Sequence, residues 1–150
     1  MRFRSALLSA LFLATILSAC SAFAPSAKEN KAVLDDFIYA LRWQRYPEAA
    51  LFFTREHRSA FLDRTDDLKG LNITDVRLKR VDLSPDGRQA DVRLEIDYYL
   101  LPSATLKTLQ INQTWVYFET PDTEGSGFMI TTAFPEASAW ARGGKGTVTP

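Results

Sequence analysis

The chain has 150 residues, of which 46% are apolar and 12% aromatic, and its 18 acidic side chains balance 18 basic ones. This apolar content excludes disordered, collagen-like and low-complexity chains, which bury too little surface to offset the entropy of ordering. The balanced charge excludes a polybasic nucleic-acid-binding protein, because such binding needs a positive field that releases counterions from phosphates. The length predicts a single domain.

The N-terminus has the pattern of an export signal. Arg2 and Arg4 precede an apolar run over residues 6–17. A helix needs about 20 apolar residues to cross a bilayer core of about 30 Å, so this run is too short for a transmembrane anchor. We therefore predict a cleaved signal peptide over residues 1–19.

The end of this segment, Leu17-Ser18-Ala19-Cys20, resembles the lipobox of bacterial lipoproteins. The resemblance implies a diacylglycerol thioether on the Cys20 sulfur, cleavage before Cys20, and acylation of its amine by a fatty acid such as palmitate. Cys20 is the only cysteine in the sequence, and two or three acyl chains anchor a protein stably to a membrane. The residue after the lipid site is Ser21 and not an aspartate. In bacteria of the enteric type, this resemblance implies sorting to the outer membrane, with the domain on the periplasmic side of the envelope.

Helices are predicted in the first half of the remaining chain. Residues 20–29 are expected to form a short lipidated tether. A capping-box spacing at residues 26–29 and an apolar stripe of helical period predict a first helix that ends near residue 45. Pro47 suits the first turn of a second, short helix, and a third helix is expected over residues 55–64.

Strands are predicted in the second half, where the hydrophobic period changes to two. Within residues 71–83 the alternation changes parity near Lys79, and one extra residue, a β-bulge, would restore it. Residues 90–100 alternate cleanly between apolar and polar. Residues 105–119 carry apolar side chains on both faces, which predicts a central strand, and residues 127–134 are the last strand.

Helices followed by strands predict an α+β domain over residues 30–134, with the helices packed on one face of a curved four-stranded antiparallel sheet. Residues 135–150 lack apolar periodicity and are expected to be a flexible tail. The order of elements, with WQRYPEAA at residues 43–50, resembles the nuclear transport factor 2-like fold, whose relatives include ketosteroid isomerase. Residues 113–117 and 127–130 are similar to the terminal hairpin of small proteobacterial lipoproteins in that superfamily. The resemblance implies a cone-shaped sheet wrapped around the first helix.

The sequence lacks a recognisable pattern of catalytic or metal-binding residues. Zinc sites need three or four nitrogen or sulfur ligands, and His57 is the one histidine. Asp63, Asp66 and Asp67 lack the spacing of a calcium-binding loop and are interpreted as a solvated helix end. Residues 143–147 lack the glycine and serine positions of a phosphate-binding loop. We therefore predict no catalytic residue, metal or cofactor.

Aromatic side chains with polar tips are the remaining candidates for a site. Core packing accounts for most such rings. In a cone-shaped domain they would also line a pocket whose polar tips orient an apolar ligand. The candidate ligand-pocket residues are Trp43, Tyr46, Tyr98, Trp115 and Tyr117.

These observations favour an outer-membrane-anchored, non-catalytic module that binds a small apolar ligand or another envelope protein. The alternative is an isomerase- or cyclase-like enzyme acting on a small apolar substrate, which needs a carboxylate base and an oxyanion donor in the pocket. Asp97 and Tyr99 are the nearest such pair, but their parity on the strand predicts that they point away from the apolar face. A third hypothesis is a homodimer that pairs through the polar sheet face, at Arg93, Glu95, Asp97 and Tyr99.

Overall fold

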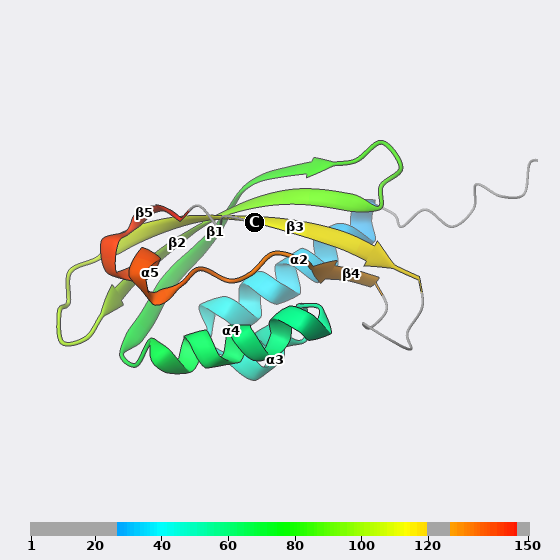
Figure 1. Ribbon diagram of the computed structural model, residues 1–150. Coiled ribbons are helices and arrows are strands. Elements are labelled where there is room, and N and C mark those ends of the chain that lie inside the picture. The colour runs from blue at the N-terminus through cyan, green and yellow to red at the C-terminus, as the bar shows by residue number, and fades with distance from the viewer. Residues whose placement is uncertain (1–26, 120–126, 147–150) are drawn as a thin grey trace, which may run out of the picture.

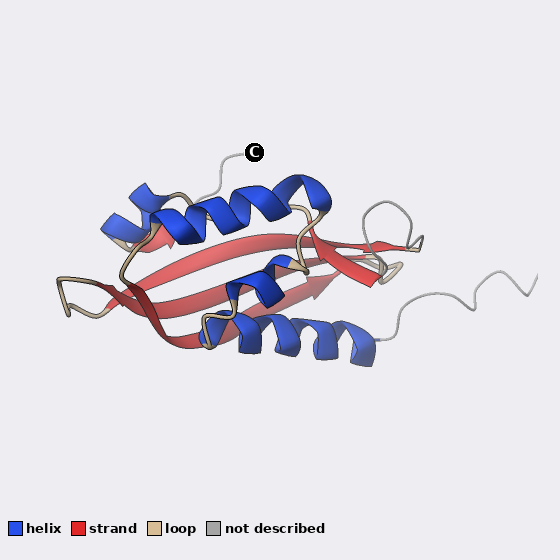
Figure 2. Ribbon diagram, turned by 90° about the horizontal axis from the view of Figure 1, so that it is seen from below, coloured by secondary structure: helices blue, strands red, loops and turns tan. Residues whose placement is uncertain are grey.

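The structure is a computed structural model in which residues 27–119 and 127–146 are described. The predicted signal peptide and the predicted lipid attachment site, Cys20, lie outside the described residues. The described chain has the expected α+β class. Its helices lie on one side of a curved sheet, and the other side of the sheet has no helix among the described residues (Figures 1 and 2).

The three helices expected from the sequence are present. They are α2 (Ala27–Arg42), α3 (Tyr46–Ala50) and α4 (Arg55–Asp67). Three side chains of α2 that lie three and four residues apart, Leu34, Phe37 and Leu41, are buried in the core. α2 ends before Gln44, whose φ of 55° turns the chain out of the helix. Pro47 then lies in the first turn of α3, where the missing N–H of proline costs no hydrogen bond.

Four antiparallel strands form the predicted meander, in the spatial order β1-β2-β3-β4. They are β1 (Leu71–Leu83), β2 (Gln89–Leu100), β3 (Lys107–Phe118) and β4 (Gly127–Ile130). β4 is shorter than the predicted strand over residues 127–134. Beyond Ile130 the backbone N–H of Thr114 donates to the Thr132 hydroxyl at 2.8 Å, so a side chain replaces the next backbone acceptor of the ladder.

β1 contains the bulge that its change of parity predicted. Its pairing with β2 shifts between Leu78 and Arg80, which leaves Lys79 without a cross-strand partner. Beyond the bulge, Val81 and Leu83 pair with buried residues of β2 and so lie on the same face of the sheet as those residues. We call this the inner face, because the helices pack against it (Figure 1).

Aromatic rings in contact with one another fill the core between the helices and the inner face. The ring centroids of Phe37 and Trp115 lie 5.4 Å apart and join α2 to β3. The ring of Phe53 stacks on Phe61 at 4.6 Å, and Phe61 meets Phe134 edge-on at 4.8 Å. Each such pair stabilises a fold by about 0.5–1.5 kcal/mol beyond the burial of its area. These contacts hold the helices on the sheet.

The prediction of a flexible tail over residues 135–150 is wrong for most of that segment. It forms α5 (Ala137–Arg142) and β5 (Gly144–Gly146), and β5 pairs with β3 in parallel. The Trp140 side chain is fully buried with its ring 4.9 Å from that of Tyr98. The Tyr98 hydroxyl donates to the Trp140 carbonyl at 2.5 Å. A helix of six residues held by one tryptophan leaves no periodic pattern in the sequence.

Replacing Trp140 by alanine is expected to lower the free energy of unfolding by about 3–5 kcal/mol, because a large buried ring leaves a cavity. The matched control is Trp43→Ala, since the Trp43 side chain is 62% exposed. That variant should change stability by no more than about 0.5 kcal/mol. Urea denaturation of both variants measures the two losses. Equal losses would contradict the packing of α5 in the core.

Candidate ligand-binding groove

An open apolar groove of about 230 Å³ lies between the start of α2 and one end of the sheet. Two of its lining residues come from α2 and seven from β1, β2, β3 and β4. They are Lys31, Leu34, Leu78, Val81, Leu83, Ala90, Val92, Trp115 and Phe128. Lys31 is the single ionisable side chain of this lining, as far as the described residues define it. The groove is therefore an apolar surface with one positive charge on its lining.

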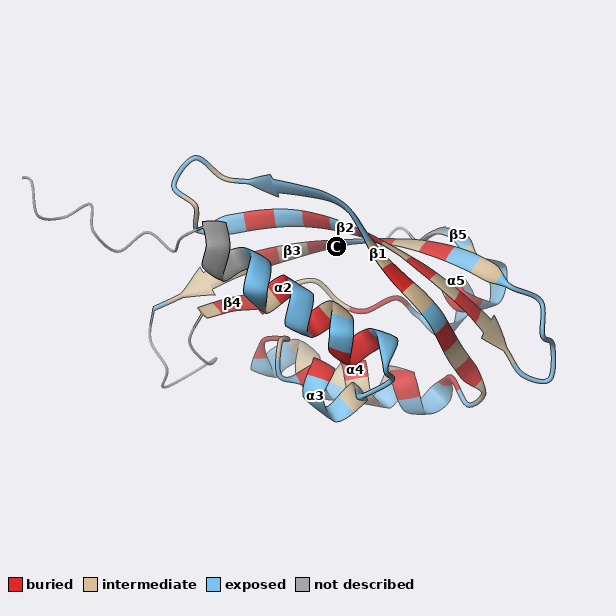
Figure 3. Cartoon of the chain, turned by 180° about the vertical axis from the view of Figure 1, so that it is seen from behind, coloured by how far each residue is buried: buried red, intermediate tan, exposed pale blue. Residues whose placement is uncertain are grey.

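Three aliphatic side chains of β1 make the groove unusual, because they lie on the inner face and yet are exposed. Leu78, Val81 and Leu83 are 39%, 38% and 43% exposed. In Figure 3 the half of β1 that carries them is coloured as exposed throughout, and the other half of β1 contains the buried residues. Apolar side chains grouped in this way mark binding surfaces more often than singly scattered ones.

A difference in length between α2 and β1 leaves these side chains uncovered. α2 has 16 residues and spans about 24 Å at 1.5 Å per residue. β1 has 13 residues and spans about 43 Å at 3.3 Å per residue. α2 packs against β1, but a helix of this length cannot cover the inner face of the whole strand.

Ala90 and Trp115 form the hollow part of the groove. They are cross-strand partners, and Ala90 also pairs with Leu83 on its other side. The small alanine side chain between two larger ones leaves space on the surface of the sheet. The Trp115 Nε1 donates to the Gln113 Oε1 at 3.3 Å, so the polar atom of this indole is satisfied within the protein.

The structure brings one of the five predicted pocket residues, Trp115, to the groove. Tyr98 is fully buried beside α5. Tyr117 is half-buried, and its ring contacts that of Phe128 in β4. Trp43 is exposed at the end of α2. Tyr46 is half-buried, and its buried hydroxyl has no hydrogen-bond partner among the described residues. Burial raises the pKa of Tyr46 to about 12, so it stays protonated at neutral pH.

Sequence reasoning missed Lys31 and the aliphatic side chains of β1 as site residues. The predicted bulge already placed Val81 and Leu83 on the inner face, as the structure confirms. The signal that could have found the groove was the excess length of this strand over the first helix. Lys31 lies one turn before Leu34 on α2 and gave no separate signal.

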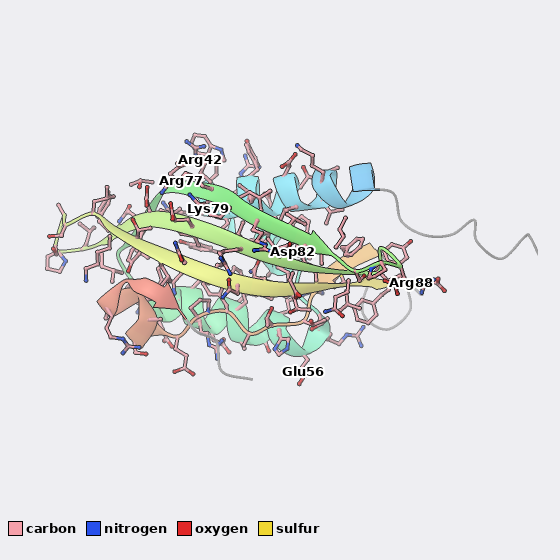
Figure 4. All side chains as sticks on the ribbon, turned by 90° about the horizontal axis from the view of Figure 1, so that it is seen from above. Arg42, Glu56, Arg77, Lys79, Asp82 and Arg88 are labelled. Atoms are coloured by element: carbon pink, nitrogen blue, oxygen red, sulfur yellow. The ribbon has the colours of Figure 1, made fainter. Side chains whose placement is uncertain are left out.

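The outer face of the sheet is polar, and its charges pair with one another. Arg77 and Lys79 lie close together there, and Arg42 at the end of α2 reaches Asp75 of β1 at 3.3 Å (Figure 4). The Arg77 guanidinium bonds to carboxylates of Asp97 at 2.5 Å, of Glu95 at 2.7 Å and of Asp75 at 2.9 Å. These hydrogen bonds hold the pKa of Asp97 and that of Glu95 below their usual values. Both carboxylates are therefore ionised partners of an arginine.

The prediction that Asp97 and Tyr99 point away from the apolar face is confirmed. Ile96 and Tyr98, which alternate with them, are fully buried, whereas Asp97 and Tyr99 are partly exposed. The Asp97 carboxylate also accepts a hydrogen bond from the Thr108 hydroxyl at 2.7 Å. A base in an apolar cavity has a raised pKa, whereas the pKa of Asp97 is lowered. This pair therefore lacks the environment that ketosteroid isomerase-like chemistry needs.

The other candidates are spread over the surface. His57 is half-buried on α4, and Asp63, Asp66 and Asp67 are exposed on the same helix. Within residues 27–119 and 127–146, no three side chains of metal-ligating type come together. None of the described helices is long and apolar enough to span a bilayer.

Comparison with known proteins does not place the chain in a family. No family model matches its sequence, and no curated protein shows significant similarity to it. The α+β class and the antiparallel meander are observed in the structure. The resemblances to a lipobox and to the nuclear transport factor 2-like fold are hypotheses.

Replacing Arg77 by methionine is expected to lower the melting temperature at pH 7, because Asp97 and Glu95 lose their cationic partner. A carboxyl with a lowered folded-state pKa contributes stability above its unfolded pKa of about 4, and that contribution is lost as the pH falls through the folded value. The gap between variant and wild type should therefore be largest near pH 7 and narrow below about pH 4. Circular dichroism melts between pH 7 and pH 2.5 measure this gap.

The control for this experiment is Lys69→Met, which removes an exposed charge at the end of α4. It should show a small difference from wild type at every pH. A gap for Arg77→Met that stays constant down to pH 2.5 would contradict the assigned ion pairs.

Proposed function

We propose that the protein is a membrane-tethered, non-catalytic module that binds a small apolar ligand in the groove between α2 and the sheet. The observation that carries this proposal is the exposure of Leu78, Val81 and Leu83 on the inner face of β1. Covering such side chains with a ligand is favourable by about 25 cal/mol for each Å² of apolar surface removed from water. The groove thus offers binding energy that the described part of the chain leaves unused.

The chemistry of the lining favours binding over catalysis. General acid–base catalysis needs groups that reach the reacting atoms together, and a nucleophile needs a base beside it. The described lining offers Lys31 alone as an ionisable group. The nearest carboxylate and tyrosine pair, Asp97 and Tyr99, lies on the opposite face of the sheet. These placements support a ligand-binding role over an isomerase or cyclase.

We also propose that the domain is a divergent member of the nuclear transport factor 2-like superfamily. The order of helices before strands and the packing of α2 on a curved antiparallel sheet support this relationship (Figure 1). In this proposal the open groove is the counterpart of the cavity that a cone-shaped sheet encloses.

The tether is proposed from the lipobox-like segment that ends at Cys20. Residues 21–26 separate that cysteine from the start of α2, so Cys20 and Ala27 lie at most about 25 Å apart along an extended chain. Lys31 and Leu34, which line the groove, lie within the first half of α2. A lipid on Cys20 would therefore hold the groove near the membrane surface, where apolar ligands are concentrated.

Ligand binding can be tested with Nile red, a neutral fluorescent dye that binds apolar surfaces. Replacing Val81 by aspartate is expected to weaken dye binding at least tenfold, because a charge in the apolar lining must be desolvated. The partly exposed position of Val81 should allow the variant to fold. The control is Leu106→Asp, an exposed leucine outside the groove, which should leave the affinity unchanged. Equal affinity of both variants and wild type would exclude the groove as the site.

Membrane tethering can be tested with Cys20→Ser in a bacterial host. The serine cannot form the thioether, so the variant is expected to leave the membrane fraction or to accumulate as the uncleaved precursor. Fractionation and intact-mass measurement separate these results from lipidation. Wild-type protein that carries a free thiol and starts at Met1 would contradict the tether.

A further inference from the structure

We infer that the ligand of the groove is a fatty acid, whose single aliphatic chain lies along β1 and whose carboxylate pairs with Lys31. This inference rests on the proposed function and names the chemical class of its ligand. Three observations carry it: the length of the apolar lining along β1, the single positive charge, and the position of the groove on the face of the sheet.

The length of the apolar lining suits an extended chain. The exposed aliphatic residues run from Leu78 to Leu83, which is a length of about 16 Å along a strand. The lining continues across the sheet to Trp115 and Phe128. An extended aliphatic chain can therefore lie along β1 within this lining.

The charge of the lining favours an acid over a neutral amphiphile. The Lys31 ammonium bonds to the Asp35 carboxylate at 2.7 Å, but the two side chains are 73% and 53% exposed. An exposed ion pair of this kind is weak, so the Lys31 ammonium can bond to a ligand instead at little cost. The aliphatic stem of Lys31 can meanwhile pack against the apolar part of that ligand.

The position of the groove disfavours an extended peptide as its occupant. Peptides of that kind add to an unpaired sheet edge, where backbone groups are free to bond. The groove instead lies on the inner face, where side chains of four strands line it. The border of the sheet beside it is β1, whose bulge at Lys79 and charged side chains disfavour the addition of a strand. Side chains therefore make the contacts, and an aliphatic chain needs no hydrogen bonds.

The test compares dodecanoate with dodecanol, which share the same aliphatic chain and differ in head-group charge. Each is titrated at pH 8 against the purified full chain with bound Nile red, and displacement gives the affinity. We expect dodecanoate to bind wild type about tenfold more tightly than dodecanol does. Lys31→Met should abolish this preference and leave dodecanol binding within twofold of wild type, whereas Lys31→Arg should keep the preference.

The control variant, Lys69→Met, removes an exposed lysine elsewhere and should keep the preference. Circular dichroism confirms that each variant is folded. Equal binding of the two ligands to wild type, or a preference that persists in Lys31→Met, would overturn the fatty-acid inference but leave an apolar binding site in place. Failure of Nile red and of both ligands to bind wild type would instead overturn the proposed function, and the inference with it.

Discussion

The two faces of this sheet depend on two residues of β1 that have no cross-strand partner. Thr74 and Lys79 are each inserted between paired segments, and these two insertions keep the aliphatic side chains of β1 on the inner face along its whole length. Without the insertion of Lys79, Val81 and Leu83 would project from the outer face, among the ion pairs of Arg77, and charged side chains would line the groove instead. The apolar groove and the polar outer face are therefore two results of the same bulge.

The inner face is divided between a filled and an open part, and Trp115 belongs to both. Its ring contacts Phe37 in the aromatic core and also lines the groove. A binding surface that rests on close-packed rings is held rigid before a ligand arrives, so little conformational entropy is lost on binding. The α5 segment fills the other part of the face, where Trp140 covers Tyr98. The C-terminal residues thus help to determine which part of the sheet stays open.

The sequence was informative where structure is local. The apolar stripe of α2, Pro47 at the start of α3 and the parity change in β1 each depend on neighbouring residues, and the structure confirms all three. The polar-tipped rings were harder to place, because Tyr98 bonds to a carbonyl 42 residues away. The groove was not predicted, because it arises from the unequal lengths of two elements that are distant in the sequence. The difference in length follows from the predicted ranges, but which part of β1 the helix leaves open becomes visible only when the elements are packed together.

The return of the chain after β4 has a consequence for self-association. β4 pairs with one end of β3, and β5 pairs with the other end. These two short strands thus cover the edge of β3 that faces away from β2. The opposite border, among the described strands, is β1, where Arg77, Lys79 and Arg80 surround an irregular backbone. Cationic, irregular borders resist the addition of a strand from another molecule. Copies gathered at high density should therefore not join their sheets edge to edge into fibrils.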